Sequence, residues 1–232
     1  MSKKRKQDFN ETSQVKKLND SKIELDVINL SPTLKEQLIY LNKEKTSWIK
    51  LIKLEANKGG LTQSDFEDLW KLKPSEKLKI KIAGKLIECP RYSKSFLKAY
   101  KFTGLNHEAD MDLPKRIQEL LEWSKKEYKN EDLNQSLVNW YESDGSIGKH
   151  SDDTKQLKPD SDIFSFSFGP ATRKFILEPK VKTVGSKKYH INVENNTLVI
   201  MGGKCQLTHY HSVPKVNNDA NRRLNVTFRC FK

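Results

Sequence analysis

The sequence has no long hydrophobic run, and this absence excludes a membrane-spanning protein at the outset. Its longest apolar stretches, such as Thr197-Leu-Val-Ile-Met201, are far shorter than the roughly 20 residues that a spanning helix needs. The first residues, MSKKRKQDF, are charged rather than apolar, so they do not form a secretory signal. We therefore expect an intracellular protein that does not interact with membranes.

The chain is also poor in cysteine, with only Cys89, Cys205 and Cys230. Because these residues are odd in number, lie far apart and form no Cys-x-x-Cys pair, we expect neither a disulfide framework nor a cysteine-based zinc site. This usage is typical of a reducing compartment, and it sets aside the secreted and zinc-finger classes.

Positive charge, by contrast, is abundant. The 232 residues contain 43 Lys and Arg against 30 Asp and Glu, which gives a net charge of +13. Such a balance suits a polyanionic partner, above all nucleic acid, although a lysine-rich composition with many Asn and Ile produces the same count. The basic run Lys3–Lys6 favours the nucleus over the cytoplasm as the location.

Composition divides the chain into a polar tail and one folded domain. Residues 1–20 carry many Lys and almost no apolar anchor, so we expect a disordered basic tail before a single domain over 21–232. In the first part of that domain, 21–136, helical patterns predict a helical cover. The helices are expected from Ser31-Pro32 through Leu34, Leu38 and Leu41, from Thr62 to Trp70, and from Pro114 onward.

The second part of the domain, 137–232, alternates with a period of two, which predicts strands. The segment Phe164–Phe168 alternates fully and ends at Gly169-Pro170. Further strands are expected at Lys174–Leu177, Tyr189–Val193, Leu198–Met201 and Leu224–Phe231. Helices followed by many short strands predict an α+β fold whose sheet part is a sandwich or a barrel.

The last strand carries a chemical clue because its two faces differ. One face is apolar, and the other holds Arg223, Asn225, Thr227 and Arg229. An ordinary amphipathic strand would place these polar residues in water. Solvated faces elsewhere in the chain are mostly Lys, however, and the planar donor fork of Arg matches a carboxylate or a phosphate. Because buried arginines need an anion, we interpret this face as a dicarboxylate or phosphate site.

Five histidines are available as metal ligands: His107, expected in a loop, His190, expected in the core or on the surface, and His150, His209 and His211. His150 and Asp152 are two residues apart on extended backbone, so their side chains point to the same side. Either His209 or His211 would complete a two-histidine, one-carboxylate set, which is typical of non-haem Fe(II) oxygenases. A lone His-x-Asp is a frequent chance match, and His150 by itself would be a surface or capping residue.

Five segments carry a more specific signal when they are taken together. They are Asn139-Trp-Tyr141, Ile147-Gly-Lys-His-Ser-Asp-Asp153, Ser165-Phe-Ser-Phe-Gly169, Tyr210-His-Ser-Val-Pro214 and Arg223-Leu-Asn-Val-Thr-Phe-Arg229. This combination resembles the AlkB dioxygenases, and within them the vertebrate homologues that repair duplex DNA. The resemblance runs from about Ile80 to Lys232, roughly two-thirds of the chain.

The resemblance implies a double-stranded β-helix (jelly-roll) core that uses Fe(II), 2-oxoglutarate and O2. By their places in the motifs, His150, Asp152 and His211 would bind the iron, and His211 is preferred to His209 because Ser-Val-Pro follows it. The implied contacts to 2-oxoglutarate are Asn139, Tyr141, Arg223, Asn225, Thr227 and Arg229.

Two upstream segments, Pro90-Arg91 and Tyr100-Lys-Phe-Thr-Gly104, resemble the family's nucleotide-recognition lid. There Phe102 would stack on a flipped base, with a core aromatic as the alternative, while Tyr100 would line the pocket and Asp153 would contact the base. Basic residues around the lid would hold phosphates: Lys85, Arg91, Lys94, Lys98 and Lys101.

One stretch departs from the family pattern. The duplex-repair homologues carry an apolar finger with an aromatic residue, whereas Lys81-Ile-Ala-Gly-Lys85 has Ala83 at that place, flanked by Ile82 and Gly84 as further substrate contacts. Alanine is too small to fill the gap left by an extruded base, and Ile82 would substitute only in part. The preference for duplex DNA over single-stranded DNA or RNA therefore stays open.

The resemblance implies a monomeric DNA-repair enzyme that oxidatively demethylates bases such as 1-methyladenine and 3-methylcytosine. One alternative is an oxygenase of the same superfamily that acts on RNA or on a protein side chain, since kinship alone does not fix a substrate. Another is a non-catalytic nucleic-acid-binding module, which would have no use for a complete set of His150, Asp152, His211 and Arg223.

Overall fold

The computed structural model describes residues 23–30, 35–56, 58–102, 105–216 and 222–232. The tail expected over 1–20, the helix start expected at Ser31-Pro32 and the Thr103-Gly104 end of the lid motif lie outside these ranges. Within them, no helix combines the length and the apolar character that crossing a membrane requires.

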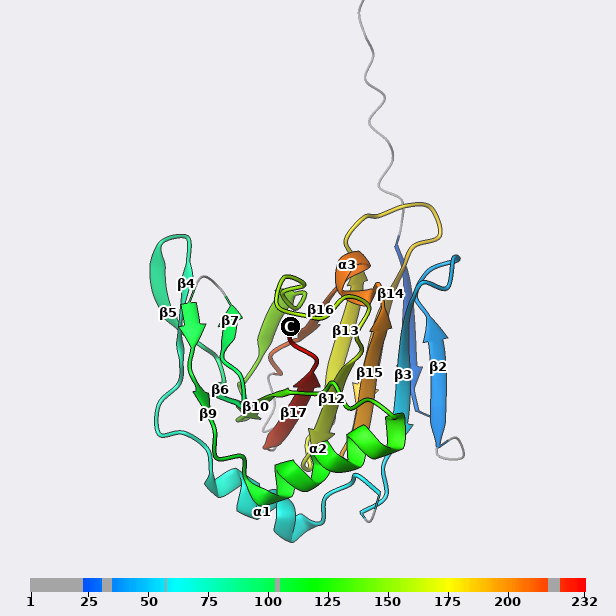
Figure 1. Ribbon diagram of the computed structural model, residues 1–232. Coiled ribbons are helices and arrows are strands. Elements are labelled where there is room, and N and C mark those ends of the chain that lie inside the picture. Colours follow the sequence, from blue (N-terminus) through cyan, green and yellow to red (C-terminus); the bar gives the residue numbers. More distant parts are fainter. Residues whose placement is uncertain (1–22, 31–34, 57, 103–104, 217–221) are drawn as a thin grey trace, which may run out of the picture.

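Two sheets make up the body of the protein (Figure 1). The larger one follows the order β2 (Glu36–Tyr40), β3 (Ser47–Lys53), β15 (Thr197–Gly203), β12 (Ile163–Phe168), β17 (Arg223–Arg229), β10 (Gln135–Tyr141), β6 (Tyr92–Phe96) and β9 (Ala109–Asp110). The smaller one follows the order β1 (Glu24–Asn29), β14 (Lys187–Val193), β13 (Arg173–Pro179), β16 (His209–Val213) and β11 (Ile147–His150). This arrangement confirms the predicted α+β fold with a jelly-roll core.

Two helices pack on the outer face of the larger sheet (Figure 1). Helix α1 (Gln63–Lys71) begins at Thr62, which forms a capping box with Asp65. Helix α2 (Lys115–Tyr128) begins directly after Pro114 and buries Ile117, Leu120 and Leu121. Both helices were predicted from their caps and apolar spacing, and both predictions are confirmed.

The helix predicted to continue to Leu41 is wrong over its described part. Residues Glu36–Tyr40 form strand β2, which pairs antiparallel with β3. Burial along β2 alternates with a period of two, because Gln37 and Ile39 are half-buried while Leu38 and Tyr40 are exposed. Pairing with a buried neighbour therefore overrides the helical spacing of the leucines. Strands from the region expected to form a helical cover thus complete both sheets, while the boundaries at 21 and 137 stay predictions.

The core strand predictions fit the sheets, and β17 shows why they matter. Its apolar face, which includes Leu224, Val226 and Phe228, belongs to the core beneath the helices. Its polar face points toward the smaller sheet, so all seven residues of the strand are buried. Both faces of β17 are therefore committed to the interior, and the polar one needs partners there.

Three smaller elements flank this body. The hairpins β4 (Lys79–Ile82)–β5 (Lys85–Glu88) and β7 (Tyr100–Phe102)–β8 (Leu105–His107) stand beside the main sheets (Figure 1). His107 accordingly ends a strand, where a loop was expected. The short helix α3 (Cys205–Thr208) joins β15 to β16. Ile80, Tyr100 and Lys101 of the two hairpins line the cavity that is described below.

Candidate metal and dicarboxylate site

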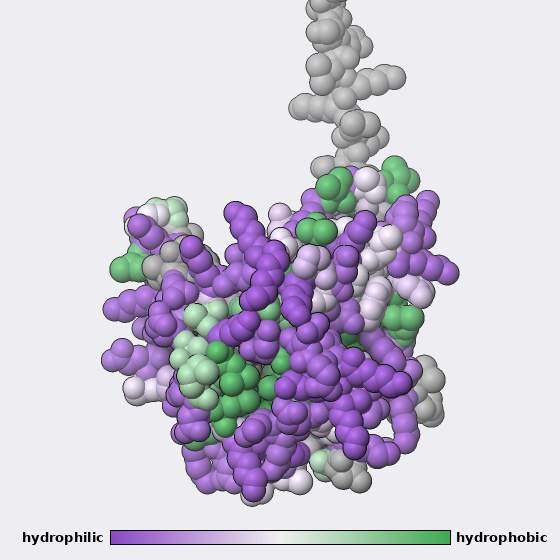
Figure 2. Space-filling model, in the orientation of Figure 1, coloured by the Kyte–Doolittle hydropathy of each residue, from purple (hydrophilic) through white to green (hydrophobic). Residues whose placement is uncertain are grey.

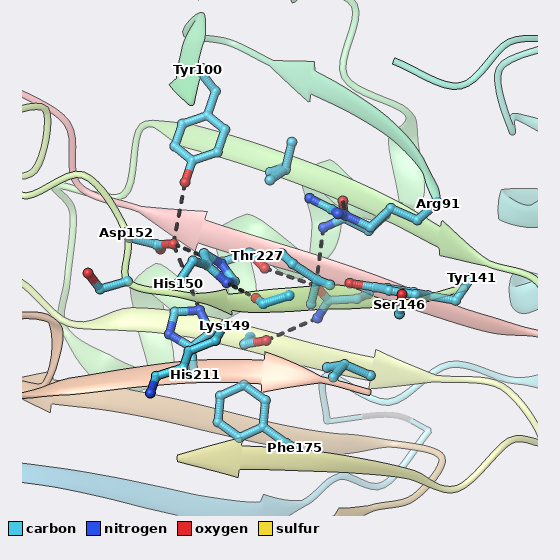
Figure 3. Close-up of a pocket in the computed structure, with 18 of the residues that line it drawn as sticks. Arg91, Tyr100, Tyr141, Ser146, Lys149, His150, Asp152, Phe175, His211 and Thr227 are labelled. Atoms are coloured by element: carbon cyan, nitrogen blue, oxygen red, sulfur yellow. Dashed lines mark hydrogen bonds and ion pairs between the residues drawn. The ribbon is translucent and has the colours of Figure 1, made fainter. Parts of the chain in front are cut away.

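A cluster of three metal-ligating side chains lies between the sheets. One ligand atom from each of His150, Asp152 and His211 lies within 4.8 Å of the others. The antiparallel pairing of β11 with β16 sets His150 directly opposite His211, and their ring centroids are 4.2 Å apart. Figure 3 shows the two imidazoles beside the Asp152 carboxylate. Two imidazoles and one carboxylate on one side of an ion leave its other positions open, which suits an oxygenase iron.

Three hydrogen bonds hold Asp152 in place, and a fourth orients one of its partners. Nε of Arg229 donates to Oδ2 at 2.7 Å, and the Tyr100 hydroxyl donates to Oδ1 at 3.3 Å. The backbone N–H of Asp152 donates to Oε1 of Gln206 at 2.9 Å, while Gln135 accepts from Nη1 of Arg229 at 3.1 Å and so orients that arginine. Ligands that are fixed in this way bind a metal with little reorganisation.

The protonation states of the cluster favour a cation. Burial alone would raise the pKa of Asp152, but the charge of Arg229 and the two imidazoles hold it well below its usual range. Burial, reinforced by the neighbouring His150, lowers the pKa of His211 to about 3. Nδ1 of His150 lies 2.8 Å from the carbonyl oxygen of Gly148, which leaves Nε2 directed at the cluster. One carboxylate and two neutral imidazoles are the forms that bind metal ions.

His209 lies outside this cluster. It is buried on the same strand, and its Nδ1 lies 2.8 Å from the hydroxyl of Thr208, which in turn bonds to Ser47. His211, not His209, should therefore be the third ligand. We expect His211→Ala to weaken Mn(II) binding by more than about 100-fold, because loss of a residue that only supports a ligand costs about 10- to 100-fold. His209→Ala should retain binding. Metal titration of both variants checks this; the reverse ranking would refute it.

Buried His209 also predicts acid sensitivity. Burial lowers its pKa to about 4, against about 6.5 in the unfolded chain. The unfolded state therefore binds the extra proton, so the free energy of unfolding is unaffected above pH 6.5 and decreases as the pH falls toward 4. The loss should reach about 3 kcal/mol from this residue. Urea unfolding at pH 7 and pH 4 should show a smaller pH effect for His209→Asn; equal effects in variant and wild type would contradict the prediction.

The opposite end of the polar face of β17 is built around Arg223. Its Nη2 donates to the hydroxyl of Ser167 at 2.6 Å, and its guanidinium stacks 4.9 Å from the centre of the Tyr141 ring. Nε and Nη1 are buried and have no hydrogen-bond partner among the described residues. Two open donors of one planar fork match the two oxygens of a carboxylate. Arg223 thus offers what the sequence predicted: a place for one carboxylate of a dicarboxylate.

A polar network lies between Arg223 and the metal cluster. Asn139 on β10 faces Asn225 on β17, with Nδ2 3.4 Å from Oδ1. Oδ1 of Asn139 accepts from Arg91 at 3.0 Å and from Ser93 at 2.7 Å. Because Oδ1 is occupied twice, the amide of Asn139 is fixed and can offer only its N–H groups to a ligand. Thr227 donates to Asn225 at 3.2 Å and extends the network.

One cavity of about 760 Å³ is lined both by the metal cluster and by Arg223. Its lining brings together most of the site residues predicted from the sequence: Arg91, Tyr100, Asn139, Tyr141, His150, Asp152, Asp153, His211, Arg223, Asn225, Thr227 and Arg229. Figure 3 shows Tyr100 and Arg91 on the side of this cavity away from His211 and Phe175. Gly84 lies outside the lining, at the turn of the β4–β5 hairpin. The side chains of Ile82 and Phe102 are beyond what the structure describes.

Arg229 differs from the expectation in one respect. It was expected to contact a dicarboxylate, and it lies on the cavity wall, but its charge is matched inside the protein by Asp152. Its guanidinium also stacks 4.7 Å from the centre of the Tyr100 ring. Arg229 is therefore first a partner of the metal cluster, and of the two arginines on the polar face of β17 it is Arg223 that has open donors.

The sequence did not single out several residues that support the site. Gln135, Ser167 and Gln206 make the contacts given above, and Phe175 packs 5.6 Å from His211, centroid to centroid. Ser146 lies on the cavity wall and donates its backbone N–H to the carbonyl oxygen of Pro90 at 3.1 Å. Ser167 lies within the Ser165–Gly169 motif but was given no role, and the other residues belong to none of the five motif segments.

Comparisons with known proteins agree with this site. A family model described as the 2OG-Fe(II) oxygenase superfamily matches residues 89–229, which contain the whole cluster. A solved structure, "The structure of OsALKBH1", is similar in fold, with a TM-score of 0.52 and 19% sequence identity over 83% of this chain and 99% of that chain.

Two curated relatives are similar in sequence. "Alpha-ketoglutarate-dependent dioxygenase alkB homolog 3" of Rattus norvegicus is 38% identical over 104 residues, 42% of this chain and 35% of the relative. "DNA oxidative demethylase ALKBH2" of Mus musculus is 31% identical over 161 residues, 65% of this chain and 66% of the relative. The match thus spans about a third of the first relative's length. The residues also fit the family's requirements, since the cluster suits Fe(II) and the open donors of Arg223 suit 2-oxoglutarate. The chain belongs to the 2OG-Fe(II) oxygenase superfamily and is an AlkB-like member of it.

Proposed function

We propose that this chain is an oxidative demethylase of N-alkylated nucleic-acid bases, such as 1-methyladenine and 3-methylcytosine, and that it repairs alkylated DNA. The observation that carries the proposal is the pairing, in one cavity, of the cluster His150, Asp152 and His211 with the open donors of Arg223. One of the relatives is named a DNA oxidative demethylase, and this supports a DNA substrate.

Two groups of residues in the cavity would hold the metal and the co-substrate. His150, Asp152 and His211 would hold Fe(II), and Arg223 with Tyr141, Asn139 and Asn225 would hold 2-oxoglutarate. Bound there, iron would supply the oxidising chemistry, in which O2 and 2-oxoglutarate yield succinate, CO2 and a hydroxylated methyl that leaves as formaldehyde. The protein's own part is to orient these groups and to exclude water from the reacting methyl.

The base would enter between the hairpins and the metal cluster. Tyr100 forms one wall, because its hydroxyl bonds to Asp152 while its ring stacks on Arg229. Asp153 lines the cavity, and its carboxylate accepts the backbone N–H of Lys155 at 2.9 Å, which fixes it beside the iron site. Stacking of a flipped base on Phe102 stays a prediction. Such stacking contributes about 1–3 kcal/mol and tolerates any base.

Of the basic residues expected to hold phosphates, Lys85 and Lys101 are best placed, because Lys94 and Lys98 already have partners within the protein. Lys94 is paired with Asp110 at 2.7 Å, and Lys98 bonds to carbonyl oxygens at the end of the chain. Lys85 and Lys101 are exposed and have no ion pair among the described residues. Figure 2 shows that the visible face of the molecule is largely hydrophilic. A backbone contact through Lys85 and Lys101 would be independent of sequence.

The β4–β5 hairpin provides a test of strand preference. Ala83 and Gly84 form its turn with φ of 47° and 81°, and open space surrounds Gly84. Leu86 and Ile87 are exposed on β5, so the hairpin presents apolar side chains although its tip is small. We expect Ala83→Phe to raise activity on duplex DNA about fivefold or more, because an aromatic wedge replaces the stacking of the extruded base. Initial rates on matched duplex and single-stranded substrates check this.

The control is Ala83→Leu, which adds bulk without an aromatic ring and should give a smaller gain. An unchanged ratio of duplex to single-stranded activity in Ala83→Phe would show that the hairpin does not set the strand preference. Ala83 already has positive φ, so either substitution adds a side chain without changing the backbone conformation that the turn demands.

The substrate class is tested by direct competition. The protein is given 3-methylcytosine in single-stranded DNA, duplex DNA and RNA of one sequence, and loss of the methyl group is followed by mass spectrometry. The proposal expects turnover on at least one DNA form. Turnover on RNA alone would favour an RNA demethylase, and binding without turnover of any substrate would favour a non-catalytic module.

A further inference from the structure

Arg173 is a fully buried arginine that the site described above does not use. It begins strand β13 and is 1% exposed. Its Nη2 donates to the carbonyl oxygens of Gly145 and Pro214 (2.8 Å to the latter). Nε and Nη1 have no hydrogen-bond partner, and no acidic side chain pairs with this guanidinium in the part of the chain that the structure describes. A buried charge in this state is costly unless something else compensates it.

The ring of Tyr141 connects Arg173 to the cavity. The guanidinium carbon of Arg173 lies 5.8 Å from the ring centre, and that of Arg223 lies 4.9 Å from it. Two positive charges thus flank one aromatic ring. Burial is the largest cause that lowers the pKa of Arg223, and the charge of Arg173 lowers it further. The two guanidinium groups therefore repel each other, and an anion beside Arg223 would relieve both.

Arg229 shows what a compensated arginine looks like in the same protein. Its Nε contacts the carboxylate of Asp152 at 2.7 Å, and its Nη1 contacts Gln135. Arg229 lies six positions from Arg223 on β17, so their Cα atoms are about 20 Å apart. The unmatched positive charge is consequently concentrated at the Tyr141 end of the cavity, away from the metal cluster.

We propose that Arg173 is a positioning residue that selects a dianionic 2-oxo acid, by adding a second positive charge behind Arg223 at the distal carboxylate. The inference rests on the proposed function of Arg223 as the 2-oxoglutarate anchor. Arg173 does not line the cavity, so it acts through the field at Arg223 and through the Tyr141 ring. Its hydrogen bonds to the carbonyl oxygens of Gly145 and Pro214 hold the guanidinium in place. Gly145 precedes the strand that carries His150, and Pro214 follows the strand that carries His211.

The test measures binding rather than turnover. Wild-type protein and Arg173→Gln are loaded with Mn(II), and the dissociation constants of 2-oxoglutarate and 2-oxopentanoate are measured by calorimetry. The second compound has the same chain with a methyl group in place of the distal carboxylate. Arg173→Gln should weaken 2-oxoglutarate binding by about tenfold or more and leave 2-oxopentanoate nearly unchanged. Arg173→Lys, which keeps the charge, should stay close to wild type.

Arg222→Gln is the matched control, because Arg222 pairs with Glu67 outside the cavity and should affect neither ligand. Equal weakening of both ligands by Arg173→Gln would show a merely structural role and overturn the proposal, as would unchanged 2-oxoglutarate binding. Failure of the Mn(II)-loaded wild type to bind 2-oxoglutarate would instead refute the proposed function. The preference of the wild type for 2-oxoglutarate over 2-oxopentanoate can be measured even if a variant does not fold. A preference below about tenfold would also overturn the proposal.

Discussion

Replacing Arg223 with glutamine should raise the KM for 2-oxoglutarate by about 100-fold or more while Mn(II) binding stays intact. The two open donors, Nε and Nη1, would each form a charge-assisted hydrogen bond worth about 1.5–3 kcal/mol, and glutamine cannot present the same fork. Metal binding should persist because Arg223 contacts Ser167 and Tyr141 and none of the cluster residues. Steady-state kinetics at varied 2-oxoglutarate, together with metal titration, measure the two effects.

The same variant makes an unusual prediction about stability. Arg223 has no acidic partner among the described residues, so removing its charge should not decrease the free energy of unfolding of the ligand-free protein. Arg222→Gln again serves as the control for kinetics. An unchanged KM in Arg223→Gln, with metal binding retained, would mean that the dicarboxylate lies elsewhere.

Replacing Asp152 with alanine should abolish both metal binding and turnover, and it should also destabilise the protein by about 3–5 kcal/mol. The first effect follows from the loss of the only carboxylate of the three-residue cluster. The second follows because Arg229, 4% exposed, would be left as a buried charge without its partner at 2.7 Å. Metal titration and urea unfolding measure the two effects separately.

A double variant separates the two roles of Asp152. Adding Arg229→Met to Asp152→Ala removes the orphaned charge, so most of the lost free energy of unfolding should return while metal binding stays absent. Asp152→Asn, close in size to the native residue, should likewise lose the metal with a smaller loss of stability. Retained Mn(II) affinity in Asp152→Ala would contradict the ligand assignment, and an undiminished free energy of unfolding would contradict the role of the Arg229 pair.

Local patterns predicted much of the fold because they coincide with packing. Thr62 caps α1 and Pro114 precedes α2, so both helix starts were visible in the sequence. The alternation in β17 likewise predicted which residues face the cavity. The pattern around Leu38 and Leu41 misled, since leucines spaced for a helix lie in or beside a strand whose conformation depends on pairing with β3. The local spacing of the leucines does not show that β3 will pair with this segment.

The candidate site was predictable where a motif is contiguous and hidden where support comes from elsewhere. His150 and Asp152 are neighbours in sequence, whereas Gln206 reaches Asp152 from helix α3, which is more than 50 residues further along the chain. The sequence also could not show that Arg229 is matched by Asp152 while Arg173 is matched by nothing acidic among the described residues. Some of the positive charge of the chain is thus held inside the protein, as in Arg229 and Arg173, whereas Lys85 and Lys101 beside the hairpins are exposed.

The central claim is that the cluster and Arg223 form one oxidative site that acts on a methylated base. It is tested most directly by incubating the protein with Fe(II), 2-oxoglutarate and a 3-methylcytosine oligonucleotide, and by measuring succinate, formaldehyde and the remaining methyl group together. We expect equal amounts of succinate and formaldehyde, matching the methyl lost, and none of the three changes in Asp152→Asn. Binding of the oligonucleotide without turnover on any methylated strand, single or double, would contradict the account.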